Sequence, residues 1–239
     1  MDCWIKQITR GCVLVFSAFL VGYSAGAQTT TNVYWDFSNP SGPDQPTSGT
    51  ISGLATSFSF GNAASLKYEN ASSSSGYITQ AGFAASGDTN AFVAARKGEF
   101  DLATNTYFSF SLSLDTGAET AYSITDVSLG SRSTASGPVG LGLYFSTDDA
   151  NFSAVGSSLA VNPDGNWAAA DFSGANISLP NDGSTVYFRL YGSGGSSTSS
   201  SNWRIDDLAV TISPVPEPSV FALSLLGGAT LLPGFRRRK

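Results

Sequence analysis

Strict alternation of apolar and polar residues runs through the middle of the chain. Residues 107–114 (YFSFSLSL) place an apolar side chain at every second position with serines between them, and residues 139–145 and 186–191 repeat this period of two. Such alternation is typical of half-buried antiparallel strands. Turn sequences such as residues 162–165 (NPDG) separate the runs. The pattern predicts that residues 28–214 form an all-β domain, an antiparallel two-sheet β-sandwich of jelly-roll-like topology with eight to ten strands.

Two of the predicted strands change the parity of their apolar positions once. In residues 122–129 the shift falls at Asp126, and in residues 203–212 it falls at Asp206 and Asp207. A shift of one residue within a strand indicates a β-bulge, and bulges often direct a side chain toward a functional site. A bulge that protects a sheet edge, or a strand buried on both faces, gives the same pattern.

Composition narrows the possible functions of this domain. Residues 28–214 contain sixteen Asp or Glu and six Lys or Arg, a net charge of −10, so we expect no binding of nucleic acid. The surplus of carboxylates would allow the domain to hold divalent cations, or would serve solubility alone. The absence of histidine excludes a Ser-His-Asp triad and His-ligated zinc. Both cysteines, Cys3 and Cys12, precede this domain, which therefore has no thiol nucleophile and no disulfide.

Residues 1–27 have the pattern of a secretory signal peptide, which would enter the membrane as a short helix. A basic start precedes the apolar stretch at residues 12–21, and small residues at 25–27 predict cleavage before Gln28. An uncleaved membrane anchor is the alternative, although the apolar stretch is short for one.

Residues 215–239 combine three features at the other end of the chain. The motif Pro216-Glu217-Pro218 comes first, an apolar segment follows at residues 220–235, and the chain continues with the basic residues Arg236, Arg237, Arg238 and Lys239. A sixteen-residue helix spans ~24 Å, somewhat less than the ~30 Å hydrocarbon core, and arginine side chains that reach the interface can make up the difference. The segment predicts one short transmembrane helix in the inner membrane, with the basic cluster in the cytoplasm and the domain on the exported side.

This three-part segment resembles the PEP-CTERM sorting signal of Gram-negative bacteria. The resemblance implies that an exosortase-type membrane protease recognises the motif at Pro216-Glu217-Pro218 and cleaves near it. The protein would be anchored in the membrane only transiently, then released or attached at the cell surface, in association with exopolysaccharide and biofilm. Glu217 would be a recognition residue and not a catalytic one. A plain C-terminal anchor is the alternative.

Two segments of the central domain resemble the jelly rolls of bacterial surface proteins. Residues 144–152 (YFSTDDANF) are similar to a strand-turn-strand pattern of that group, and residues 202–210 (NWRIDDLAV) are similar to its last strand. Asp149 stands where glycine is usual, so this turn would differ from the pattern. Such sandwiches serve as sugar-binding modules, adhesive domains and enzyme appendages, so the resemblance implies the fold and leaves the function open.

The jelly-roll resemblance also implies a metal site. Carbohydrate modules of this type commonly carry a structural calcium ion near the first and last strands, and Asp36, Asp206 and Asp207 would supply its oxygen ligands. No EF-hand loop is present. Otherwise Asp206 would pair with Arg204 or Arg189, or would lie in solvent.

Aromatic residues offer a second candidate site. Tyr187, Arg189 and Tyr191 alternate along one strand and would form an outward row that could contact a glycan, with Trp167 beside a turn as a further contact. Tryptophans of β-sandwiches are more often part of the core, which is what we expect of Trp35 and Trp203. A polysaccharide would be the partner of such a platform.

No catalytic motif is present in the domain. A glycoside hydrolase needs two carboxylates at a set separation, but none of the acidic residues lies in a recognisable motif, and no nucleophile elbow or phosphate-binding loop occurs. The sequence therefore predicts an exported, non-catalytic surface or matrix protein. A carbohydrate-binding module with a defined glycan ligand is the alternative, followed by a polysaccharide-active enzyme.

Overall fold

The computed structural model describes the main part of the central domain. The described residues are 29–37, 46, 49, 51–61, 64–68, 91–96, 107–118, 120–195 and 202–215. None of these residues forms a helix, so this part of the chain contains no helix that is long and apolar enough to cross a membrane. The predicted signal peptide and the predicted sorting signal, including Pro216, Glu217, Pro218 and the arginine cluster, lie outside the described residues.

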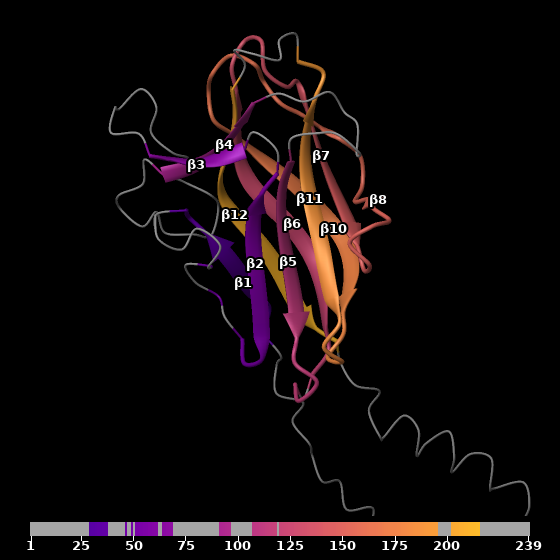
Figure 1. Cartoon of the computed structure of the whole chain (residues 1–239). Helices are drawn as coiled ribbons and strands as arrows, with labels where there is room; N and C mark the ends of the chain where they lie inside the picture. Colours follow the sequence, from indigo (N-terminus) through magenta and orange to yellow (C-terminus); the bar gives the residue numbers. More distant parts are fainter. Residues whose placement is uncertain are drawn as a thin grey trace, which may run out of the picture.

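Two antiparallel sheets pack face to face, as the alternating pattern predicts (Figure 1). Sheet A has the strand order β10-β6-β12-β4-β3, with β1 also paired to β12. Its strands are β1 (Thr31–Trp35), β3 (Ala64–Tyr68), β4 (Ala91–Arg96), β6 (Tyr122–Ser133), β10 (Ala168–Leu179) and β12 (Asn202–Pro214).

Sheet B has the order β2-β5-β11-β7-β8, with β9 also paired to β7. Its strands are β2 (Leu54–Phe60), β5 (Tyr107–Leu114), β7 (Gly140–Ser146), β8 (Ser153–Ala154), β9 (Leu159–Ala160) and β11 (Thr185–Ser193). The described residues thus form twelve strands where eight to ten were expected. The two-residue strands β8 and β9 are too short to give an alternation signal in the sequence.

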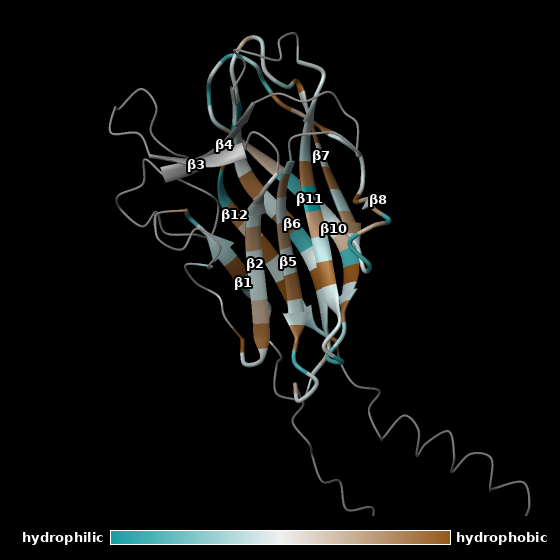
Figure 2. Ribbon diagram, in the orientation of Figure 1, coloured by the Kyte–Doolittle hydropathy of each residue, from teal (hydrophilic) through white to brown (hydrophobic). Residues whose placement is uncertain are grey.

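The core lies between the sheets and is rich in aromatic rings. Along β5 every second side chain is buried, in the order that the alternation predicts, and brown and pale bands follow one another along this strand in Figure 2. Trp35 and Trp203 are both fully buried, which confirms their assignment to the core. Phe110 of β5 stacks on Phe188 of β11 with ring centroids 4.7 Å apart. Burial of each such ring contributes about 1.5–3 kcal/mol.

Both predicted bulges are present. In β6, Asp126 faces Thr211 of β12 while Ile124 faces Ile212, so Thr125 has no opposite residue. In β12, Asp206 faces Gly130 and Ala209 faces Ser128, so two residues, Asp207 and Leu208, lie opposite one residue of β6. The second bulge falls where β12 changes partner, because β4 pairs with residues 202–205 and β1 pairs with residues 208–212.

One predicted core position is wrong. The alternation in residues 139–145 suggests that Val139 points inward, but its side chain is 46% exposed. β7 begins only at Gly140, and Val139 lies before the strand, where its N–H donates to the carbonyl of Ser193. The pleat that buries Leu141 and Leu143 therefore does not extend to Val139.

Candidate functional site

A shallow groove of about 230 Å³ lies on the outer face of sheet B. Its floor carries four serines, Ser57 and Ser59 from β2 and Ser109 and Ser111 from β5. The remaining polar lining consists of Tyr107, Tyr187, Arg189 and Asp149. The groove is thus built from three neighbouring strands and from the loop that follows β7.

The serines form two pairs across the strands. Ser57 lies opposite Ser111 with their hydroxyl oxygens 2.8 Å apart, and Ser59 is hydrogen-bonded to Ser109 in the next row. These side chains point outward because the apolar residues between them point into the core. A serine hydroxyl both donates and accepts hydrogen bonds, so the floor can serve donors and acceptors of a ligand alike.

β11 adds a ring and a cation to the same face. Tyr187 lies opposite Ser111, and Arg189 lies opposite Ser109. The Arg189 guanidinium lies over two rings, with its central carbon 4.6 Å from the centroid of Tyr107 and 4.0 Å from that of Phe152. A planar guanidinium is favoured at such a place because it stacks on aromatic faces. The sequence prediction that Tyr187 and Arg189 share one outward row thus agrees with the placement of both in the groove.

Asp149 lines the groove next to the Arg189 guanidinium. Its Oδ1 atom lies 3.1 Å from Nη2 of Arg189, and its side chain is 56% exposed against 19% for Arg189. Asp149 has a φ of 55°, in the left-handed region that glycine most readily adopts. The turn therefore has the backbone form that a glycine would give, and the departure from the jelly-roll pattern adds a carboxylate to it.

Asp148 holds this turn in place. Its Oδ1 atom accepts hydrogen bonds from the backbone N–H of Asn151 at 2.7 Å and of Ala150 at 2.9 Å, and from the hydroxyl of Ser146 at 2.7 Å. The donors of Asn151 have the largest effect, and together these hydrogen bonds lower the pKa of Asp148 well below its usual value. The turn that presents Asp149 is therefore stabilised by an ionised carboxylate.

Tyr191 lies in the predicted row, but it is not available to a ligand. Its side chain is fully buried, with ring centroids 5.5 Å from Tyr107 and 5.6 Å from Tyr144. Burial raises the pKa of its hydroxyl, which is hydrogen-bonded to Arg189. Tyr191 therefore contacts Arg189 within the protein, and its assignment as a glycan contact is corrected, because alternation shows only the face of a strand and not what covers it.

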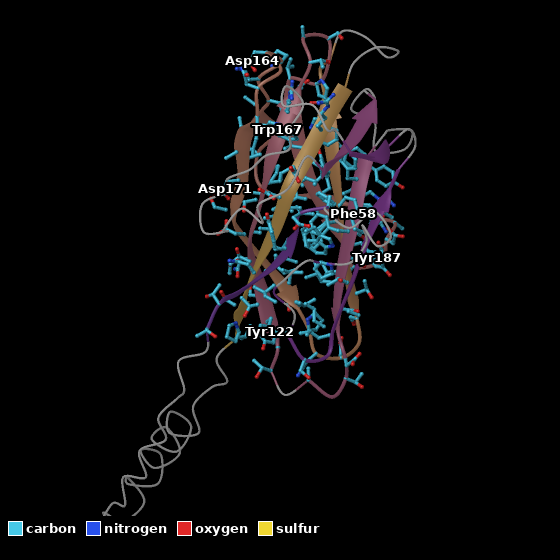
Figure 3. The ribbon with its side chains drawn as sticks, turned by 90° about the vertical axis from the view of Figure 1, so that its left-hand side faces the viewer. Phe58, Tyr122, Asp164, Trp167, Asp171 and Tyr187 are labelled. Atoms are coloured by element: carbon cyan, nitrogen blue, oxygen red, sulfur yellow. The ribbon has the colours of Figure 1, made fainter. Side chains whose placement is uncertain are left out.

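Trp167 lies apart from the groove. It is half-buried in the loop that leads into β10 of sheet A, and the groove lining does not include it. Figure 3 shows Trp167 near Asp164, away from Tyr187. The structure therefore does not join Trp167 to the row on β11.

The three aspartates predicted to bind calcium come together at the bulge of β12. Asp36, Asp206 and Asp207 are all buried. The Tyr34 hydroxyl donates a hydrogen bond to Oδ1 of Asp207, and the N–H of Asp207 donates to Oδ1 of Asp206 at 2.9 Å. Burial raises the pKa of Asp207 to about 6, and the charge of Asp36 adds to this effect. The pKa of the Tyr34 hydroxyl is raised, mainly by burial. The hydrogen bond to Asp207 and the negative charges of the three aspartates raise it further.

The aspartates of this cluster are engaged with one another and with Tyr34. Within the described part of the chain, no group of three or more acidic, histidine or cysteine side chains is placed to hold a metal ion. Oxygens of Asp206 and Asp207 already accept hydrogen bonds from within the protein. The calcium site stays a prediction. Two of the alternatives for Asp206 are wrong, because Arg189 pairs with Asp149 and because Asp206 is fully buried and does not lie in solvent.

The other bulge leads to a second pair of acids that the sequence did not reveal. Asp126 of β6 is hydrogen-bonded to Asp171 of the neighbouring β10, and burial together with this carboxylate raises the pKa of Asp126. Its Oδ1 atom is buried without a hydrogen-bond partner among the described residues. The pair belongs to sheet A, on the other layer of the sandwich from the groove.

Comparisons with known proteins find similar solved structures only. No protein-family model and no curated protein matches the sequence. The carbohydrate-binding module TmCBM61, solved with β-1,4-galactotriose, is 17% identical with a TM-score of 0.33, over 68% of this chain and 88% of that chain. The K1 adhesin domain of Lys-gingipain from Porphyromonas gingivalis W83 is 16% identical with a TM-score of 0.36, over 76% and 97%. A family 29 carbohydrate-binding module is 9% identical with a TM-score of 0.36, over 77% and 88%. TM-scores of this size assign no function to the chain.

Proposed function

We propose that the domain is a non-catalytic glycan-binding module of an exported surface or matrix protein. The observation that carries this proposal is the groove on sheet B, where paired serine hydroxyls, the Tyr187 side chain and the Arg189–Asp149 pair lie on one open surface. Sugars combine apolar ring faces with many hydroxyls, and sites that bind them combine aromatic surface with a few placed polar groups. The groove supplies both kinds of contact.

The same lining supports binding over catalysis. Glycoside hydrolysis uses two carboxyl groups on opposite sides of the scissile bond, about 5–9.5 Å apart. Asp149 is the one carboxylate among the described lining residues, and it is already paired with Arg189. A sugar bound over the serines would therefore be held without an acid and base to cleave it.

The test of binding is affinity electrophoresis through gels that contain neutral polysaccharides such as dextran, β-glucan and galactan. We expect a saturable retardation of the wild type by at least one polymer and its loss in Tyr187→Ala, which removes a partly exposed ring from the groove. Trp167→Ala is the matched control, since Trp167 is also a partly exposed aromatic residue but lies outside the lining. Retardation that survives Tyr187→Ala and is lost in Trp167→Ala would move the site to the other part of the domain.

The sorting signal completes the proposal. The motif Pro216-Glu217-Pro218, the apolar segment and the arginine cluster support transient insertion in the inner membrane and processing by an exosortase-type protease. A glycan-binding domain delivered in this way would be retained in the exopolysaccharide outside the cell.

Processing is tested by the intact mass and fractionation of the protein in its native host. We expect the wild type to lose both terminal segments and to appear outside the cell. A variant with Pro216, Glu217 and Pro218 replaced by alanine should stay in membranes with its basic residues. If wild type and variant both keep the segment and stay in membranes, the motif is a plain anchor and exosortase is not a partner.

A further inference from the structure

The groove contains one cation and one anion among its described lining residues, and the two are paired. Arg189 Nη2 lies 3.1 Å from Asp149 Oδ1, so the lining as a whole is electrically neutral. A groove with an unpaired arginine would attract a carboxylated or sulfated sugar, since guanidinium groups bind such anions in a bidentate manner. The sequence shows Arg189 on its strand but gives no sign that Asp149, forty residues away, neutralises it.

The guanidinium of Arg189 is engaged by four side chains. The rings of Tyr107 and Phe152 lie against it, the hydroxyl of Tyr191 is hydrogen-bonded to it, and Asp149 forms an ion pair with it. An anionic sugar would have to displace Asp149, which competes at the high effective concentration of a group in the same chain. It would also meet the exposed carboxylate of Asp149 at short range, where like charges repel strongly.

The backbone at Asp149 has a form that aspartate adopts as well as glycine. A φ of 55° is unfavourable for most residues other than glycine, asparagine and aspartate. Four hydrogen bonds that the Asp148 carboxylate accepts from Ser146, Ala150 and Asn151 hold the chain in this form. The turn thus presents a side chain, where a glycine would satisfy the backbone alone.

We infer that the groove selects uncharged sugars and excludes uronate-containing or sulfated chains, with Asp149 as the residue that determines this specificity. The inference rests on the proposed glycan binding and names the ligand class of that same site. Oδ1 of Asp149 is used by Arg189, and Oδ2 has no partner among the described residues, so it can accept hydrogen bonds from sugar hydroxyls. The net charge of −10 over residues 28–214 adds a weaker repulsion that salt screens.

The test compares each neutral polysaccharide with its own carboxymethylated derivative, so that the two polymers differ in charge and share a backbone. The variant is Asp149→Asn, which keeps the size of the side chain and is readily accommodated in the left-handed region, so the turn persists. The control is Asp164→Asn, which changes the net charge equally from an exposed turn outside the lining.

For the wild type we expect binding to the neutral polymer about tenfold or more tighter than to its charged derivative. Asp149→Asn should narrow this ratio about fivefold or more through tighter binding of the charged polymer, and Asp164→Asn should leave the ratio unchanged. Equal binding of both polymers by the wild type would overturn the inference while glycan binding stands. Equal effects of the two variants would also overturn it, since net charge and not the groove would then set the preference. If no polymer of either kind binds to any of the proteins, the proposed function fails and the inference falls with it.

Discussion

The hydroxyl of Tyr34 donates a hydrogen bond to the carboxylate of Asp207, a residue 173 positions further along the chain. Tyr34 is in β1, the first strand, and Asp207 is the bulged residue of β12, the last strand. Both side chains are buried, and Asp207 has a φ of 50°, so the bulge turns its side chain toward β1 at the point where β4 ends. The bond therefore links β1 and β12 beside the bulge, in addition to their backbone pairing.

Tyr34→Phe should destabilise the domain. The change keeps the ring and removes the donor that satisfies a buried carboxylate, so we expect the free energy of unfolding to fall by about 1–3 kcal/mol near neutral pH. Urea denaturation measures it. Tyr122→Phe removes the hydroxyl of a partly buried tyrosine that packs against the core and should cost less than about 0.5 kcal/mol. Equal losses in the two variants would show that the bond to Asp207 contributes nothing of its own.

Stability should depend on pH through Asp207. Burial raises its pKa to about 6 in the folded protein, against about 4 in an unfolded chain. Between these values the folded state binds a proton that the unfolded state has released, so the free energy of unfolding falls as the pH rises from about 4 to 6, by about 2–3 kcal/mol. Asp207→Asn tolerates the left-handed backbone and should lose this part of the profile. Asp36 and Asp206 remain in both proteins, so parallel profiles of wild type and variant would contradict the assignment.

The turn that the Asp148 carboxylate stabilises should keep its hydrogen bonds in mild acid. Its pKa is lowered by hydrogen bonds, first those of Asn151, so the carboxylate stays ionised below the pH of about 4 at which an ordinary aspartate takes up its proton. Hydrogen exchange at the amide of Asn151 should therefore remain slow in mild acid. Asp148→Ala should remove the protection of this amide, so that it exchanges near the intrinsic rate for each pH. Unchanged protection in that variant would show that the carboxylate does not hold the turn.

Arg189→Lys should destabilise the domain although it keeps the positive charge. Lysine lacks the planar group that lies over Tyr107 and Phe152, so we expect a loss of about 1 kcal/mol in the free energy of unfolding. A double-mutant cycle with Phe152→Leu separates the stacking from other effects. A coupling energy near zero would mean that the ring and the guanidinium stabilise the loop independently.

Much of the fold could be predicted from the sequence because a strand has a period of two. The alternation in residues 107–114 predicts the buried face of β5, and the parity shifts at Asp126 and at Asp206–Asp207 predict both bulges. The same rule puts Tyr187 and Arg189 on one face. Each of these features depends on neighbours in the chain, and local spacing is enough to show them.

The candidate site depended on contacts between distant segments, which no local pattern encodes. The serines of β2 meet those of β5 only through strand pairing, and Asp149 reaches Arg189 only because β7 lies beside β11. Tyr191 has the same alternation as Tyr187, yet it is covered by Tyr107 and Tyr144. The period of two specifies which face of a strand a side chain occupies. Which strands become neighbours, and which loops then cover that face, follows from the packing of the whole domain, because it is the burial of both sheets together that selects one pairing among many.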